Sequence, residues 1–290
     1  MTTLILGCGY LGRRVGRILR GRGERVLGTT RSAGRFEGLA RWGVEGVVAD
    51  VNDPATLDNL PAVDRMLACV GFDRSAGVPI RSVYVDGLRL ALDRMRGRVG
   101  SVAYASSTGV YGGVDGEWLD EASPAEPRTE SGQACLDAEG VVRDFERETA
   151  TPATILRYAG LYGPGRIMRR EALLRGEPVV GDPEKWLNLV QIDDAAAAAV
   201  AALDRAASGV FCVADDRPAP RREFYRLAAE YLGAPEPRFV VPGPGSPEAR
   251  REGSNKRISN ARMRAELLAT LTYPDIATGV PAALADGGEP

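Results

Sequence analysis

The start of the chain alternates between short apolar runs and one amphipathic segment. Residues 3–6 are apolar or β-branched, which is typical of a buried strand. In residues 13–22 the large apolar side chains recur at helical spacing and fall on one face. Residues 24–30 form a second strand-like run. Together these segments predict a strand, a helix and a second strand in direct succession.

Similar apolar runs recur through the first half of the chain. They predict strands at residues 44–51, 64–71 and 99–107, and residues 83–95 show a helical pattern. Strands that alternate with helices predict a parallel sheet with helices on both faces. The expected fold class is therefore α/β with a doubly wound parallel sheet, and ligands are expected at the carboxyl ends of its strands.

A glycine-rich turn links the first predicted strand to its helix. Gly7, Gly9 and Gly12 form a GxGxxG pattern in this strand-helix-strand context. Gly7 permits the tight turn, Gly9 lets the backbone approach a pyrophosphate, and Gly12 lets the helix pack closely on the strand. N–H groups at the helix start, including those of Tyr10 and Leu11, are then expected to face the phosphates. The pattern predicts a dinucleotide site, and a turn without a ligand is the alternative.

The residues after the second predicted strand discriminate between the two nicotinamide cofactors. NAD sites usually carry an acidic residue here, which accepts from the ribose 2′-hydroxyl. This chain has Thr30, Arg31 and Ser32 instead. Because a guanidinium and hydroxyls suit a 2′-phosphate, the sequence favours NADP over NAD. A solvated surface role for Arg31 is the alternative.

The third and fourth predicted strands end at the same edge of the sheet. Asp50 either accepts from the adenine amino group or opens the turn that follows it. Its neighbour Val51 and the segment Cys69, Val70 and Gly71 are expected beside it. These positions complete the cofactor contacts predicted for the N-terminal half.

Composition narrows the chemistry that the chain can perform. It has 37 basic and 39 acidic residues, four cysteines and no histidine, and its only lysines are Lys185 and Lys256. Histidine triads and histidine proton shuttles are excluded, and without paired cysteines no metal site is expected. The net charge of −2 gives no support for a nucleic-acid partner. Scattered cysteines and short apolar runs predict a cytoplasmic protein without a membrane contact.

The segment SSTGVYG at residues 106–112 resembles a motif of the NAD-dependent epimerase/dehydratase family, the extended short-chain dehydrogenase/reductases. Later segments resemble this family in the expected order, at residues 155–166, 187–203, 209–216 and 256–264. The resemblance implies a Rossmann domain over residues 1–165, completed by residues 187–215, and a smaller substrate-binding lobe from residues 166–186 and 216–290. It also implies a small-molecule substrate and, in many members, a homodimer.

The resemblance assigns roles to single residues. Ser107 stands where family members polarise the substrate oxygen. Arg166 follows a glycine-rich turn and either clamps a substrate carboxylate or phosphate or is a surface charge. Gln191 stands where many members have a histidine. The remaining implied contacts are Thr108 to the substrate and Ser106, Tyr158 and Ala159 to the cofactor.

The tyrosine and lysine that family members use for proton transfer are missing. Between Tyr111 and the sixth strand the chain contains neither residue type. In the helix predicted over residues 130–148, alignment on Glu139 puts Ser131 and Cys135 at the two positions. A serine needs a neighbouring base, and this cysteine has no lysine beside it to lower its pKa. The catalytic candidates are Ser107, Ser131, Cys135 and Tyr111, and the chain resembles the atypical members of the superfamily.

Three functions stay open on these grounds. The first is an NADP-dependent oxidoreductase that acts on a small molecule with a changed proton-transfer group. The second is a nucleotide-sugar epimerase or dehydratase, which depends more strongly on the missing tyrosine. The third is a non-catalytic NADP-binding redox sensor. Residues 243–256 are expected to form a lid or a passive linker, and residues 286–290 a disordered tail.

Overall fold

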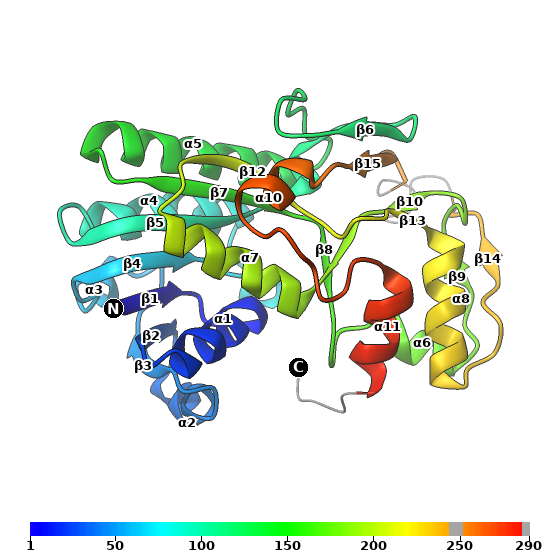
Figure 1. The fold of residues 1–290 in the computed structure, drawn as a ribbon, viewed down its shortest axis with the longest axis horizontal. Helices are drawn as coiled ribbons and strands as arrows, with labels where there is room; N and C mark the ends of the chain where they lie inside the picture. Colours follow the sequence, from blue (N-terminus) through cyan, green and yellow to red (C-terminus); the bar gives the residue numbers. More distant parts are fainter. Residues whose placement is uncertain (244–251, 286–290) are drawn as a thin grey trace.

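A seven-stranded parallel sheet forms the centre of the computed structural model, which describes residues 1–243 and 252–285. The strand order is β12-β7-β5-β4-β1-β2-β3 (Figure 1). The strands are β1 (Thr2–Leu6), β2 (Arg25–Thr30), β3 (Glu45–Val48), β4 (Val63–Ala68), β5 (Val99–Ser107), β7 (Ala153–Tyr158) and β12 (Gly209–Val213). This arrangement confirms the predicted α/β fold with a doubly wound sheet.

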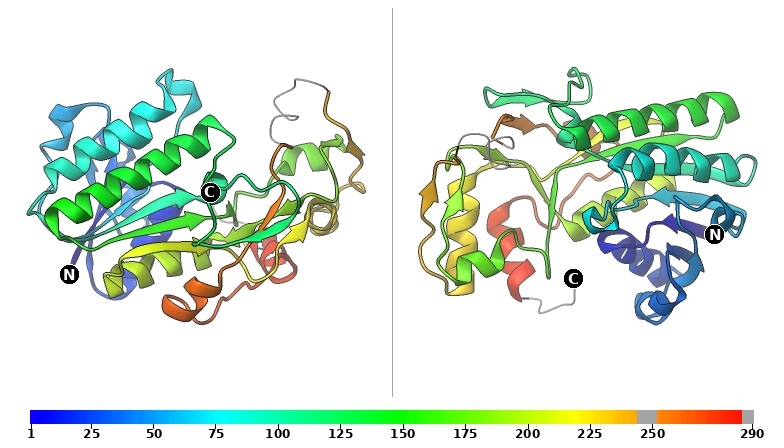
Figure 2. Two further views of the ribbon diagram at one scale, coloured as in Figure 1. Left: turned by 90° about the horizontal axis from the view of Figure 1, so that it is seen from above. Right: turned by 180° about the vertical axis from the view of Figure 1, so that it is seen from behind.

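Helices cover both faces of the sheet (Figure 2). The helices α1 (Tyr10–Gly21) and α7 (Ile192–Arg205) pack together on one face, and α4 (Gly87–Arg94) and α5 (Glu130–Thr149) cover the other. The helix predicted over residues 83–95 begins as a π-helical turn, Ser82–Asp86, and continues as α4. Shorter helical segments are α2 (Phe36–Ala40), α3 (Pro54–Leu57) and the 3₁₀ turns Ala33–Arg35, Arg74–Ala76 and Thr108–Val110.

The strand periodicity explains how one sheet supports two apolar layers. Leu4 and Leu6 of β1 pack in the layer that contains α4, and Ile5 packs in the layer that contains α1. All three side chains are 0% exposed. Because successive side chains of a strand point to opposite faces, a strand covered on both sides is apolar throughout.

The C-terminal lobe has an apolar core of its own. Tyr162, Phe224 and Val280 belong to it, and the Tyr162 and Phe224 rings meet edge to face with centroids 6.1 Å apart. The elements that build the lobe and its junction are β8 (Gly160–Tyr162), α6 (Arg170–Leu174), β9 (Val179–Val180), β10 (Trp186–Leu187), β11 (Leu189–Gln191), β13 (Ala219–Pro220), α8 (Arg221–Leu232), β14 (Phe239–Val240) and α11 (Ile276–Ala285). The domain boundaries given above stay predictions.

A second connection joins the lobe to the segment that follows β5. The strand β15 (Lys256–Ile258) pairs in parallel with β6 (Glu117–Leu119), and the helix α10 (Ala261–Glu266) packs on β12. Residues 244–251 of the predicted lid or linker and the predicted tail at 286–290 lie outside the described residues. In the part of the chain that the structure describes, no helix is long and apolar enough to cross a membrane.

Candidate active site

The glycine turn between β1 and α1 has the geometry that its pattern predicts. Gly7 has a φ of +86°, which favours glycine, and a Cβ there would lie 2.5 Å from the Cα of Val70. A Cβ at Gly12 would lie 2.7 Å from the side chain of Ile5, so α1 packs closely on β1. A Cβ at Gly9 would meet nothing within 4 Å. Because α1 begins at the next residue, the N-terminus of a helix borders that open space.

A cavity of about 330 Å³ lies at the carboxyl ends of β1 to β4. The predicted cofactor residues that line it are Gly7, Gly9, Thr30, Arg31, Asp50, Val51, Val70 and Gly71. Arg35 and Asp73 line it as well, and the sequence reasoning missed both. Arg35 is a second cation four residues after Arg31, which is a signal in the sequence, whereas nothing near Asp73 in the sequence points to its place.

Arg31 and Asp73 form an ion pair at this cavity. The guanidinium lies 2.9 Å from the carboxylate, and both side chains are about half exposed. Hydrogen bonds from Ser75 and the Arg31 guanidinium lower the pKa of Asp73 to about 2. Arg31 is therefore held beside the cavity by a partner that stays charged at neutral pH.

The other predicted cofactor residues around the turn have partners within the chain. Asp50 accepts from the Asn52 backbone N–H at 2.9 Å, so it opens a turn and lines the cavity at once. The Cys69 thiol donates to the Gly7 carbonyl at 3.3 Å. The Ser32 hydroxyl accepts from the Gly34 backbone N–H at 3.3 Å. Leu11 contributes a buried side chain to the core beside the turn.

The end of β5 directs its two serines differently. The half-buried Ser107 hydroxyl accepts from the Gly109 backbone N–H at 3.0 Å and so caps the turn that contains the buried Thr108. The buried Ser106 hydroxyl donates to the Glu139 carboxylate of α5 at 2.7 Å. Ser106 is thus tied to the helix layer, while the Ser107 hydroxyl caps a local turn and donates to no acceptor among the described residues.

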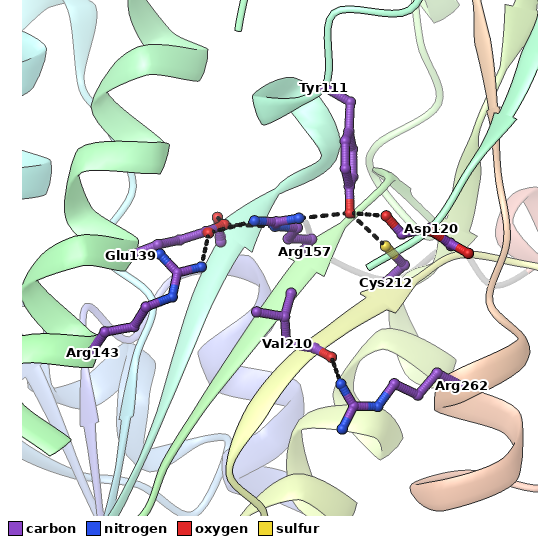
Figure 3. Close-up of polar contacts among 9 residues, drawn as sticks. Tyr111, Asp120, Glu139, Arg143, Arg157, Val210, Cys212 and Arg262 are labelled. Carbon is purple, nitrogen blue, oxygen red and sulfur yellow. Dashed lines mark hydrogen bonds and ion pairs between the residues drawn. The ribbon is translucent and has the colours of Figure 1, made fainter. Parts of the chain in front are cut away.

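A buried polar network closes the region beyond β5 (Figure 3). Arg157 of β7 donates to both oxygens of Glu139, at 2.9 and 2.7 Å, and to the Tyr111 hydroxyl at 2.7 Å. Tyr111 in turn donates to the Asp120 carbonyl at 2.7 Å and lies 3.3 Å from the Cys212 sulfur. Glu139 is 0%, Tyr111 1% and Arg157 4% exposed. Burial raises the pKa of Tyr111, so this phenol is a structural group in its observed setting.

The start of α5 offers no activated acid or base. Ser131 is exposed, and its hydroxyl lies 3.2 Å from that of Thr129, the residue that caps the helix. Cys135 is buried, and burial together with the Glu139 charge raises its pKa to about 11. The two candidates lie on one helix at the predicted spacing, yet the described part of the chain supplies neither of them with a neighbouring cation or base that would activate it.

Tyr10 connects the glycine turn to the turn that follows β8. Its hydroxyl donates to the Pro164 carbonyl at 3.1 Å. Arg166 and Arg14 both stack on its ring, with guanidinium carbons 5.3 and 4.2 Å from the ring centroid. Arg166 is exposed. Because it stacks on the first residue of α1, its cation lies beside the helix start, where it would also favour a bound phosphate.

Three residues that were predicted to contact the substrate or the cofactor use their polar atoms in hydrogen bonds within the chain. Gln191 is 1% exposed and caps α7, accepting from the Asp193 N–H and donating to its carboxylate. The buried Tyr158 donates its hydroxyl to the Ala195 carbonyl at 3.1 Å. The Ala159 N–H donates to the Val213 carbonyl at 2.9 Å. The polar atoms of these residues thus support the sheet and α7 in the described structure.

Comparisons with known proteins place this site in a family. The model of the NAD dependent epimerase/dehydratase family matches residues 3–214. The chain belongs to this family. The protein YeeZ of Escherichia coli (strain K12) is 27% identical over 278 residues, which cover 93% of this chain and 96% of YeeZ. A conserved protein of unknown function from Silicibacter pomeroyi has a solved structure with a TM-score of 0.80, 30% identity and 98% coverage of both chains.

One partial match carries a reductase name. The 3-diazoavenalumate denitrifying reductase of a Streptomyces species is 36% identical over 108 residues. The match covers 34% of this chain and 36% of that enzyme. It thus relates a part of this epimerase/dehydratase-family chain to a named reductase.

Proposed function

We propose that the chain binds NADP(H) and reduces a small molecule. The observation that carries this proposal is the cavity at the glycine turn, which is lined by two arginines and has no acidic residue at the end of β2. A helix N-terminus, an open position at Gly9 and cations at the ribose end are the features that a phosphorylated dinucleotide requires.

The residues divide the cofactor between them. Gly9 and the first N–H groups of α1 take the pyrophosphate, because no side chain blocks this approach. Arg31 and Arg35 take the 2′-phosphate, with the hydroxyls of Thr30 and Ser32 beside them. The 2′-phosphate then competes with Asp73 for the Arg31 guanidinium. When NADPH is bound, its reduced nicotinamide supplies a hydride, and the chain orients the substrate and supplies a proton.

Reduction fits this site better than epimerisation or dehydration. Those reactions remove a proton from a substrate hydroxyl as hydride leaves, and α5 has no tyrosine for that step. In a reduction, Ser107 would orient the substrate oxygen or nitrogen. Such a reaction depends less on the α5 positions of Ser131 and Cys135. The partial likeness to a reductase supports the same choice.

A turnover screen tests the proposed function. NADPH is incubated with ketones, aldehydes, imines and nucleotide sugars, and both NADPH consumption and product are measured. We expect NADPH consumption in step with a reduced product. Sugar interconversion without net NADPH consumption contradicts the proposal and supports an epimerase, and saturable NADPH binding without any turnover supports a redox sensor.

The cytoplasmic location stays a prediction from the cysteine pattern, and the homodimer stays a prediction from the family resemblance. Sedimentation velocity tests the homodimer.

A further inference from the structure

The only two lysines of the chain lie side by side. Of 37 basic residues, all but Lys185 and Lys256 are arginines, and these two are 71 positions apart in the sequence. Lys185 immediately precedes β10 and Lys256 opens β15, and these two strands are in contact. Asn255 accepts from the Trp186 backbone N–H at 3.0 Å and so fixes the two segments together. An arginine-rich chain thus places a compact, titratable amine at two adjacent points.

Lys185 lines a second cavity, of about 570 Å³, in the C-terminal lobe. Asn255, Phe239 and Val114 line it as well. The Lys185 ammonium lies 4.0 Å from the Glu252 carboxylate. Arg221 approaches the same carboxylate to 2.8 Å, so Glu252 is shared between two cations.

Lys256 connects this cavity to the segment that carries Ser107. Its ammonium donates to the Tyr111 carbonyl at 2.7 Å and to the Ser254 hydroxyl at 2.8 Å. Tyr111 ends the turn that Ser107 caps, and Val114, three residues later, lines the cavity. The cavity is therefore bordered by the segment that follows β5, and the substrate is expected at the start of that segment, beside Ser107.

We propose that Lys185 and Lys256 form the proton-transfer centre of the reductase, with Lys185 facing the substrate and Lys256 as its positioning residue. This inference rests on the proposed function. The substrate carbon gains the hydride that the reduced nicotinamide supplies, and the electron pair of its C=O or C=N π bond moves to the heteroatom. The heteroatom takes a proton from the Lys185 ammonium, and the neutral amine regains a proton from water.

Burial lowers the pKa of both amines, which favours proton exchange closer to neutral pH. Burial and the Lys185 charge lower the pKa of Lys256 to about 8, against the opposing charge of Glu117. Burial also lowers the pKa of Lys185; Arg221 adds to this, while Glu252 and Asp182 oppose it. The Lys185 charge thus makes the Lys256 proton easier to remove than the proton of an isolated lysine.

Nuclear magnetic resonance tests the pair without turnover. Reductive methylation with ¹³C-formaldehyde labels only Lys185, Lys256 and the N-terminal amine, which gives a simple pH titration. We expect one lysine to titrate near pH 8 and its pKa to rise in the Lys185→Gln variant. An Arg41→Lys variant adds an exposed reference lysine on α2's C-terminal side. Two lysines that both titrate at about 10.4, the ordinary value, overturn the proposal.

Turnover then separates a titratable amine from a fixed cation. Lys185→Arg keeps the charge and removes the titration, so we expect kcat to fall by about 10²–10⁴ with the NADPH Kd unchanged. Lys256→Arg should shift the pH profile of kcat with a smaller loss. Wild-type kcat and pH profile in Lys185→Arg overturn the proposal. If the wild type does not bind NADPH, the proposed function fails, and the titration still decides the charge state of the pair.

Discussion

The two halves of the sheet's carboxyl edge differ in what occupies them. At β1 to β4 the glycine turn leaves a cavity with exposed arginines at its rim. Near the ends of β5, β7 and β12, Tyr111, Arg157 and Glu139 of α5 bond to one another and are buried. The first half thus leaves a cavity, and the second half contains a buried polar network.

This difference shows why the glycine turn can keep its expected geometry while the proton-transfer residues of the family are missing. Backbone N–H groups bind a dinucleotide through local geometry, which needs only the glycines and the helix start. Proton transfer needs a titratable side chain, and in the second half every candidate is either buried with a raised pKa, as in Tyr111 and Cys135, or lacks a base, as in Ser131. The proton must therefore come from another element or from water.

The largest effect is expected in the closed half, the sheet edge at β5, β7 and β12, when its buried anion Glu139 is removed. Glu139→Ala leaves the Arg157 charge buried without its partner and should lower the free energy of unfolding by about 3–5 kcal/mol. The matched control is Arg143→Ala, which removes the exposed partner of the same carboxylate and should cost at most about 1 kcal/mol. Urea unfolding of both variants gives the comparison, and equal losses would mean that burial does not distinguish the two pairs.

A smaller effect is expected in the open half, the sheet edge at β1 to β4 that carries the glycine turn. Gly9→Ala adds a methyl group that meets no protein atom within 4 Å but blocks the path of a pyrophosphate. NADPH affinity should fall about 10–100-fold, or 1.4–2.7 kcal/mol, while stability stays near that of the wild type. Gly21→Ala, at the other end of α1, also meets nothing within 4 Å and serves as the control for calorimetric titration. Equal NADPH affinity in both variants would place the pyrophosphate elsewhere.

Asp215 is an exception within the closed half. Its carboxylate is buried at the end of β12 without a hydrogen-bond partner among the described residues, and burial raises its pKa well above the usual range, although the nearby Arg217 N–H opposes this. A raised folded-state pKa means that its contribution to stability is full below about pH 4, the unfolded value, and is lost as the pH rises through the folded value. Asp215→Asn should therefore gain about 1 kcal/mol over the wild type at pH 8 and little at pH 4. A pH-independent difference in unfolding midpoint would show that Asp215 is not a titrating group.

The smallest effect is expected at Ser131. Its exposed hydroxyl contacts that of Thr129, so Ser131→Ala should change stability by less than about 0.5 kcal/mol and kcat by less than about twofold. A kinetic assay with the substrate found by the turnover screen measures this. A loss of kcat comparable to that expected for Lys185→Arg would return the proton transfer to α5.

Local features of the site are predictable from the sequence, and contacts between residues far apart in the sequence are not. The glycine turn, the lining by Arg31 and the helix at residues 130–148 follow from neighbouring residues and their spacing. The pairing of Arg31 with Asp73 joins residues 42 positions apart, and the pairing of Arg157 with Tyr111 joins residues 46 positions apart. Such contacts depend on which strands become neighbours in the sheet, and residue type alone does not encode that.

Gln191 illustrates the same limit for a single residue. The resemblance implies a substrate contact, while in the structure both ends of its amide bond to Asp193 at the start of α7. An amide at a helix start serves a cap or a ligand equally well, and only the side-chain rotamer decides between them.

The most direct test is a calorimetric comparison of NADPH and NADH binding to the wild-type chain and to Arg31→Glu. We expect the wild type to bind NADPH at least about tenfold more tightly than NADH, which is about 1.4 kcal/mol, and Arg31→Glu to reverse this preference. NADH binding as tight as that of NADPH to the wild type, or no saturable binding of either, would contradict it.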